Sequence, residues 1–337
     1  MVRRGREHDG AARQGRLTAW EALRPVCRAA RSVEIAHAMD TDVVCPIDIG
    51  ASRSYTIHIA GTAGEHMRFF NGVLPLLAFM VAGCSPQNYL VYHPRSYSFS
   101  LSQLSSAVHP IAFSTQQGLQ RAFYVLPRSG RLDTLWVFFP GNGSAALNWL
   151  AWTDRYPDAG TGFLLIDYPG YGFSKGSPSA ESILEVSERA FAQLALNLRS
   201  DQDQLWSKTS VLGHSLGAAT ALQFAARHAP QRVVLVSPFT SLEAIGKRIL
   251  GAWVGPLINN EYDNLVRMKE LENRKVSLHI VHGSADEVVP VDFGRELSQK
   301  FPWADYQEVN GAHHNDIFEL GRTTILRSMG TSATDSS

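Results

Sequence analysis

Cysteine is scarce in this chain of 337 residues, and its scarcity excludes several kinds of chemistry. The three cysteines are Cys27, Cys45 and Cys84, no two of them form a C-x-x-C pair, and they show no metal-ligand spacing. All three lie in the first quarter of the chain, so we expect neither thiol chemistry nor a disulfide in the remainder. The sequence predicts no metal site.

An excess of charge is also lacking, because 31 basic side chains balance 31 acidic ones. This balance argues against a nucleic acid or another polyanion as a partner. The chain is 45% hydrophobic and 18% charged, which is typical of a globular protein that buries a sizeable core. Its length allows one large domain or two ordinary ones.

The apolar run at 73–83 is much shorter than the roughly 20 residues that span a bilayer as a helix. It follows Met67 and Arg68 and ends in small residues before Cys84, as in a secretory signal. The sequence Val-Ala-Gly-Cys at 81–84 resembles the bacterial lipobox, in which the cysteine is acylated after cleavage. We therefore expect a signal over 67–83, lipidation of Cys84, and a mature protein that is exported and lipid-anchored to the cell envelope, at the outer membrane or periplasmic face. A buried apolar segment and a single-pass anchor are the alternatives.

Residues 1–66 differ from the rest, since the first 31 contain eight arginines and no lysine. We expect a disordered extension, or an upstream segment that is not translated when synthesis begins at Met67. A transit peptide is the alternative, but Glu7, Asp9 and Glu21 depart from its acid-poor pattern.

Strand-like and helix-like segments alternate from about residue 120 onward, which predicts an α/β fold with a mostly parallel sheet and helices on both faces. Residues 84–117 are expected to be a linker and the N-terminal edge, and 118–337 the main domain. Residues 119–127 are expected in an antiparallel edge hairpin, and 240–273 in a small helical cap. The expected strands are 135–139, 162–167, 210–212, 232–236, 276–281 and 306–309; the expected helices are 145–152, 180–198, 216–227, 291–300 and 315–327.

Ser215 is the candidate nucleophile. It stands in Gly-His-Ser-Leu-Gly at 213–217, after an expected strand and before an expected helix, which is the setting of a nucleophile elbow. Glycines allow so tight a turn because they have no Cβ atoms to collide. The main-chain N–H of Leu216, at the start of the helix, is positioned to bind a developing oxyanion.

A serine hydroxyl needs a base, and the base needs a group that orients it. Asp286 follows the strand at 276–281 and is the candidate acid, with Glu287 as its competitor. His313 and His314 follow later in the chain, and two adjacent histidines cannot both point at the serine. The motifs alone leave this pair open.

The three motifs together resemble single-domain membrane-anchored α/β-hydrolases, a group that includes protein depalmitoylases, lysophospholipid lipases and related serine aminopeptidases. The group's usual Gly-x-Gly-His-Asn-Asp aligns with 311–316, so the resemblance implies that His314 is the base and that His313 replaces a glycine. Gly141 and Asn142 match its oxyanion loop, where Pro140 replaces a histidine, and we assign the second oxyanion donor to the main-chain N–H of Asn142. The Gly- and Pro-rich stretch at 167–179 matches as well, and we interpret it as structural.

These parts predict a serine hydrolase of the α/β-hydrolase fold that needs no cofactor and cleaves an ester or thioester of a small-molecule or lipid-like acyl substrate. Two alternatives stay open. An aminopeptidase-like amidase requires acidic groups for the substrate's amine, and the cap offers five acids: Glu243, Glu261, Asp263, Glu270 and Glu272. A non-catalytic envelope scaffold is the other. The oligomeric state is not indicated.

Overall fold

The computed structural model describes residue 88 and residues 91–331 except 260 and 275. The expectations for residues 1–66, for the signal at 67–83 and for Cys84 lie outside this part of the chain. No helix of the described residues is long and apolar enough to cross a membrane.

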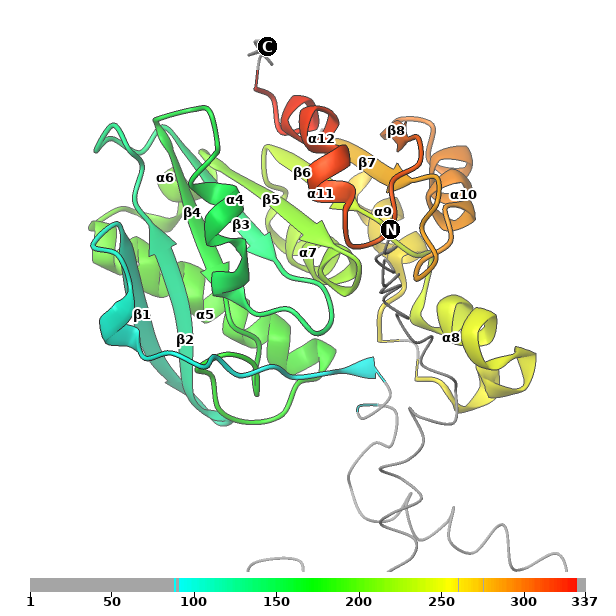
Figure 1. Ribbon diagram of the computed structural model, residues 1–337, viewed down its shortest axis with the longest axis horizontal. Helices are drawn as coiled ribbons and strands as arrows, with labels where there is room; N and C mark the ends of the chain where they lie inside the picture. The colour runs from blue at the N-terminus through cyan, green and yellow to red at the C-terminus, as the bar shows by residue number, and fades with distance from the viewer. Residues whose placement is uncertain (1–87, 89–90, 260, 275, 332–337) are drawn as a thin grey trace, which may run out of the picture. The chain divides into compact units, whose positions relative to one another are not determined.

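An eight-stranded sheet organises the domain, with the strand order β1-β2-β4-β3-β5-β6-β7-β8 (Figure 1). β1 and β2 form an antiparallel hairpin, β2 is antiparallel to β4, and the other pairs are parallel. The expected mostly parallel sheet is therefore confirmed. The strands are β1 Val108–Thr115, β2 Gly118–Val125, β3 Thr134–Phe139, β4 Thr161–Ile166, β5 Thr209–His214, β6 Arg232–Val236, β7 Ser277–Gly283 and β8 Asp305–Val309.

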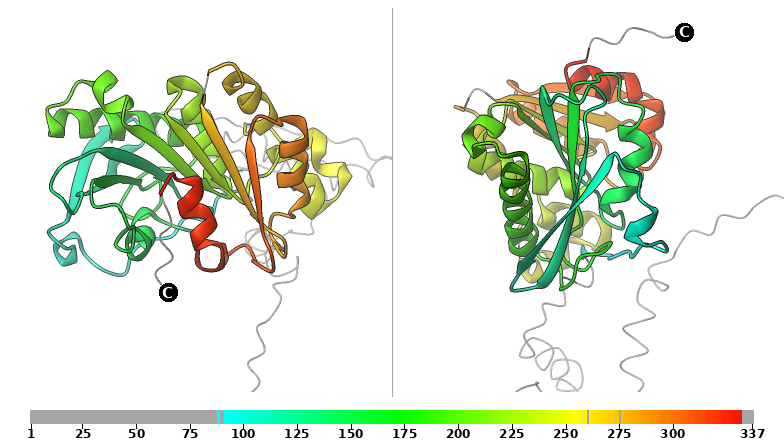
Figure 2. Two further views of the ribbon diagram at one scale, coloured as in Figure 1. Left: turned by 90° about the horizontal axis from the view of Figure 1, so that it is seen from above. Right: turned by 90° about the vertical axis from the view of Figure 1, so that its left-hand side faces the viewer.

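Helices cover both faces of the sheet (Figure 2). They are η1 Leu101–Gln103, η2 Ala146–Trp149, α4 Leu150–Thr153, α5 Ala180–Leu198, α6 Gln202–Trp206, α7 Leu216–His228, α8 Leu242–Leu250, η3 Ala252–Leu257, α9 Asn264–Leu271, α10 Asp292–Lys300, α11 Ile317–Leu320 and α12 Arg322–Ser328. The apolar residues of α5, α7 and α10 pack on one face, and those of η2, α4, α11 and α12 pack on the other.

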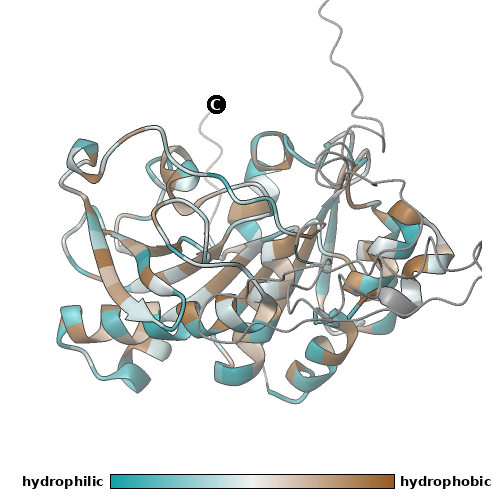
Figure 3. Ribbon diagram, turned by 90° about the horizontal axis from the view of Figure 1, so that it is seen from below, coloured by the Kyte–Doolittle hydropathy of each residue, from teal (hydrophilic) through white to brown (hydrophobic). Residues whose placement is uncertain are grey.

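The alternation of side chains along each strand creates these two cores. Within β3, Leu135 and Val137 belong to one apolar cluster, whereas Trp136 and Phe138 belong to the other. Strands that are covered on both faces are apolar throughout, which is why the central strands appear in the sequence as continuous apolar runs (Figure 3).

Two local features differ from the expected pattern. The short helix α6, capped by the Asp201 carboxylate, was not expected. The expected helix at 315–327 is two helices, α11 and α12, separated by Gly321. A Cβ atom at Gly321 would lie 2.6 Å from the Ile317 carbonyl oxygen, so the chain bends where only glycine fits. In the stretch 240–273, where a helical cap was expected, α8, η3 and α9 follow one another, and a bridge between Ser241 and Asp263 joins the residue before α8 to the residue before α9.

Candidate active site

Ser215 lies at the sharp turn between β5 and α7 and is buried. Its backbone has φ 56° and ψ −119°, a conformation that residues with a side chain rarely adopt. Such strain costs about 1–3 kcal/mol and persists only where the surrounding structure imposes it. Here the Ser215 N–H donates to the Val236 carbonyl at 2.9 Å, and the Ser215 carbonyl accepts from the Ala218 N–H at 2.9 Å.

The two motif glycines are required by close backbone contacts. A Cβ atom at Gly213 would overlap the carbonyl oxygen of Gly217, and a Cβ atom at Gly217 would overlap that of Phe139 at the end of β3. The absence of both side chains lets α7 begin directly beneath β3 and β5. This packing sets the position of Ser215 at the carboxyl ends of the parallel strands.

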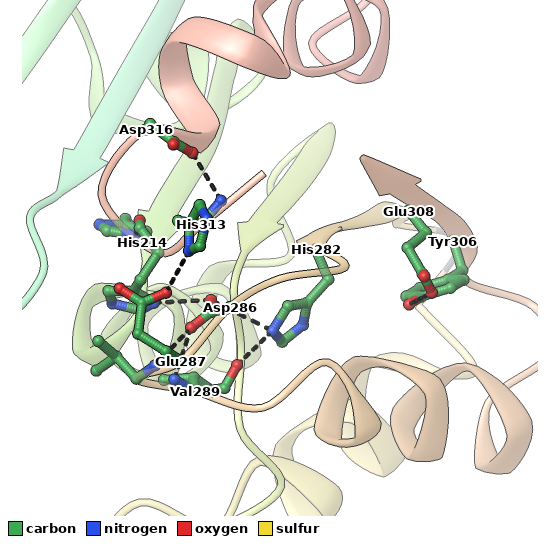
Figure 4. Close-up of polar contacts among 11 residues, drawn as sticks. His214, His282, Asp286, Glu287, Val289, Tyr306, Glu308, His313 and Asp316 are labelled. Carbon is green, nitrogen blue, oxygen red and sulfur yellow. Dashed lines mark hydrogen bonds and ion pairs between the residues drawn. The ribbon is translucent and has the colours of Figure 1, made fainter. Parts of the chain in front are cut away.

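Asp286 lies in the loop after β7 and accepts several hydrogen bonds (Figure 4). His314 Nδ1 donates to Oδ2 at 2.8 Å, while the N–H groups of Val288 and Val289 donate to Oδ1 at 3.0 and 2.7 Å. His282 Nε2 lies 3.5 Å from Oδ2. Burial raises the pKa of Asp286, but the hydrogen bonds from His282 and His314 outweigh it and hold the pKa well below its usual range. Asp286 is therefore a carboxylate at neutral pH.

The adjacent histidines face different partners. His314 is buried against Asp286. His313 is exposed, and its Nδ1 lies 2.9 Å from Glu287 Oε2 (Figure 4). The His313 N–H donates to Asp316 Oδ1 at 2.7 Å, which ties the backbone at His313 to the residue before α11. The hydrogen bond with Glu287 raises the pKa of His313. The two carboxylates and two histidines thus form one buried pair and one surface pair.

His214 connects the serine turn to the histidine loop, and reasoning from the sequence missed it. Its Nε2 donates to the His314 carbonyl at 3.2 Å, and the two ring centroids are 4.7 Å apart. Burial, followed by the proximity of His314, lowers the pKa of His214 to about 3, so its ring is neutral at physiological pH. In the sequence, the only sign that His214 contributes to the site is its position inside the serine motif.

The loop after β3 lies against Ser215. A Cβ atom at Gly141 would be 3.4 Å from the Ser215 Cβ and 3.0 Å from His214 Nδ1. Across the described ranges, no oxygen accepts a hydrogen bond from the main-chain N–H of Asn142 or of Leu216. Two free donors therefore flank the serine turn. Pro140, which departs from the expected motif, is held by a 3.0 Å hydrogen bond from the Tyr168 hydroxyl to its carbonyl.

The Asn142 side chain has a structural role that the sequence did not indicate. Its Oδ1 accepts from the His93 N–H at 2.8 Å and from the Tyr171 hydroxyl at 2.9 Å, and its Nδ2 donates to the Val91 carbonyl at 2.6 Å. These bonds attach the segment before β1 to the loop that carries a free donor.

Asp167, at the end of β4, is buried and holds the following loop. It accepts hydrogen bonds from the Tyr97 hydroxyl at 2.7 Å and from the N–H groups of Ala146 and Phe173 at 3.0 Å each. Burial raises its pKa to about 6 despite these bonds. These bonds agree with the structural interpretation of the stretch 167–179.

The described residues contain no group of three His, Cys, Asp or Glu side chains that could hold a metal ion. At the carboxyl ends of the strands lie the Ser215 hydroxyl, the neutral imidazole of His214, the imidazole of His314 paired with the Asp286 carboxylate, and two free main-chain N–H donors. Such a set has the components of nucleophilic acyl transfer.

Comparison with known proteins agrees with this architecture. Residues 136–322, more than half of the chain, match the model of the alpha/beta hydrolase family. An uncharacterised protein of Mycobacterium tuberculosis is 27% identical over 72% of this chain and 88% of its own length. Human alpha/beta hydrolase domain-containing protein 17B is 28% identical over 46% of this chain, and the match spans about half of that relative (51%).

Solved structures share the fold at low sequence identity. An esterase of Pyrococcus furiosus has a TM-score of 0.52 at 15% identity, covering 71% of this chain and 96% of its own. A fluorophosphonate-binding serine hydrolase of Staphylococcus aureus has a TM-score of 0.50 at 14% identity, covering 66% and 97%. The family match, which includes the serine, acid and histidine motifs, leads to one conclusion: this chain belongs to the alpha/beta hydrolase family.

Proposed function

We propose that this protein is a serine hydrolase that cleaves an ester or thioester, with Ser215 as nucleophile, His314 as general base and Asp286 as the group that orients the base. The observation that carries the proposal is the buried 2.8 Å hydrogen bond between His314 Nδ1 and Asp286 Oδ2, next to the strained turn at Ser215. An esterase and a serine hydrolase share this fold, which is consistent with the reaction class.

In the proposed mechanism, His314 accepts the Ser215 proton through Nε2 as the hydroxyl attacks the acyl carbonyl. Asp286 keeps the other ring proton on Nδ1 and stabilises the imidazolium that forms. The imidazolium then donates its proton to the leaving oxygen or sulfur, leaving an acyl-serine. Water, deprotonated by the same histidine, hydrolyses this intermediate and releases the acid.

The main-chain N–H groups of Leu216 and Asn142 are proposed to bind the oxyanion. Both lack acceptors among the described residues, and both lie beside Ser215. Leu216 is the first residue of α7, so the helix dipole adds to its N–H. Removing one such donor typically costs about 100- to 1000-fold in turnover.

The acids of the cap favour ester or thioester cleavage over the removal of an N-terminal amino acid. An aminopeptidase must hold a substrate ammonium with free carboxylates, and each acid of this segment already has a partner. Glu243 pairs with Lys247 at 2.5 Å, Glu261 accepts from the Ala180 N–H at 3.3 Å, Asp263 accepts from the Val266 N–H at 3.1 Å, Glu270 pairs with Arg267 at 2.7 Å and Glu272 pairs with Lys269 at 2.5 Å.

Labelling with a fluorophosphonate probe tests the reaction class. We expect the wild type to be labelled and Ser215→Ala to be unlabelled, with the variant losing at least about 1000-fold in turnover of an activated ester. A panel of p-nitrophenyl esters, acyl-CoA thioesters and aminoacyl anilides then separates the bond types. Equal labelling of both proteins would reject Ser215 as the nucleophile, and an unlabelled wild type would favour the non-catalytic scaffold.

A further inference from the structure

The end of α8 and the start of η3 expose several large apolar side chains within five residues. Ile249 is 65% exposed, Leu250 is 44% exposed and Trp253 is 70% exposed. Exposed apolar residues that stand singly are common, but a cluster of this kind marks a surface that contacts something else. We call Arg248, Ile249, Leu250 and Trp253 the α8 tip.

Packing within the domain does not require these side chains. The opposite side of α8 supplies Leu242 and Ile245 to the core, and Gly246 lies against the side chain of Ile258. The helix is therefore already anchored by its inner face. In Figure 1, α8 lies at the periphery of the domain.

The charged neighbours of the tip are basic. Lys247 pairs with Glu243 at 2.5 Å, but Arg248 has no acidic partner in the part of the chain that the structure describes. A tryptophan and aliphatic side chains beside a free arginine suit the boundary between lipid headgroups and acyl chains, since the apolar groups enter the bilayer and the guanidinium binds phosphate.

The described chain enters the domain next to the base of α8. The Tyr92 hydroxyl donates to the Tyr262 hydroxyl at 3.2 Å, and the Leu242 N–H at the start of α8 donates to the Tyr262 carbonyl at 2.9 Å. The apolar sequence at 73–83 ends nine residues before Tyr92, a reach of at most about 30 Å. A membrane attachment at Cys84 would thus hold the domain with α8 near the bilayer.

We propose that the α8 tip binds the surface of a bilayer that contains anionic lipids, with Trp253, Ile249 and Leu250 inserted at the headgroup level. The proposal concerns orientation on a membrane and does not depend on the catalytic assignment, so each can fail without the other.

Fluorescence quenching by brominated lipids tests the insertion directly in the full chain. Wild type and Trp253→Phe are mixed with vesicles of phosphatidylglycerol and phosphatidylcholine, with and without bromine on the acyl chains. Phenylalanine keeps the residue apolar, so Trp253→Phe removes one fluorophore from the tip and leaves the other six tryptophans as the same background in both proteins. We expect brominated vesicles to quench the wild type and to quench Trp253→Phe much less. Equal quenching of the two proteins overturns the proposal.

Sedimentation with the same vesicles measures the contribution of the surface. We expect the variant Ile249→Ser/Leu250→Ser/Trp253→Ser to partition at least about tenfold less than the wild type. Leu196→Ser is the matched control, because Leu196 is also 70% exposed but lies on α5, and it should bind as the wild type does. Circular dichroism melting verifies that each variant is folded. Unchanged binding of the triple variant contradicts the proposal. The proposal is also contradicted if the wild type forms a dimer without lipid and the triple variant does not, because the tip would then be a contact between copies of this chain.

Discussion

At the scale of single residues, the structure distinguishes two adjacent histidines and two adjacent carboxylates by burial. His314 and Asp286 are buried together, while His313 and Glu287 pair at the surface, each with a side chain that is 56% exposed. The buried pair retains its geometry without competition from water, whereas the surface pair is screened by solvent. Only the buried pair is suited to hold a base in one tautomer.

Replacing each histidine by alanine should separate them. His314→Ala is expected to lower turnover by about 100- to 10,000-fold, because the serine then lacks a general base. His313→Ala removes an exposed ion pair and should change turnover by less than about tenfold. Steady-state kinetics on an activated ester measure both. The opposite ranking would move the base to His313.

His214 is expected to act as a positioning residue. His214→Phe keeps a ring but loses the donor to the His314 carbonyl, and should lower kcat about tenfold or more with little change in KM, because small displacements of a base are costly. His214→Gln keeps a donor and should restore part of the loss. If the two variants have equal kcat values, the hydrogen bond does not position the base.

At the scale of elements, the loop between β4 and α5 depends on Asp167, the acid that accepts hydrogen bonds from two main-chain N–H groups and the Tyr97 hydroxyl. Its folded pKa of about 6 lies above the unfolded value of 3.8. The native state therefore binds this proton more tightly, and the stability that the protonated form contributes is lost as the pH rises through about 6.

Unfolding in urea as a function of pH tests this linkage. As the pH rises from about 3.5 to about 7, the free energy of unfolding of the wild type should fall by about 3 kcal/mol relative to that of Asp167→Asn, which has no proton to lose. Parallel pH profiles would show that the pKa of Asp167 is not raised in the folded state.

At the scale of the whole molecule, the sheet brings distant segments to one edge. The serine follows β5, the acid follows β7 and the histidine follows β8, and these strands are parallel, so their carboxyl ends meet. The hairpin of β1 and β2 closes the opposite side of the sheet, and the segment before it is bound by Asn142 in the loop after β3.

Attachment of the molecule to a membrane is predicted to depend on Cys84. Cleavage between Gly83 and Cys84 and acylation of the cysteine would give a mature protein that fractionates with membranes, because several acyl chains anchor stably where one does not. Cys84→Ser should prevent lipidation, so the lipid-anchored mature form should no longer be found in the membrane fraction. A mass spectrum from the native host checks this, and an unmodified peptide spanning 83–84 in the mature pool would contradict it.

Much of this architecture is encoded locally. Apolar runs covered on both faces predicted the parallel strands, and Gly213 and Gly217 predicted the turn, because backbone overlap there admits no side chain. The order of serine, acid and histidine motifs, with the family resemblance, predicted Ser215, Asp286 and His314 as the catalytic residues, and the structure shows the hydrogen bond between His314 and Asp286. These features depend on neighbouring residues, so a sequence can reveal them.

The tertiary structure alone decided how those residues pair and what supports them. The motifs allowed either histidine and either carboxylate, and the pairing depends on how two loops, after β7 and after β8, direct adjacent side chains inward or outward. Likewise, His214 contacts a carbonyl 100 residues away, and Asn142 binds a segment about 50 residues before it. Contacts of this kind arise only when packed strands bring distant segments together, so no local pattern of residues encodes them.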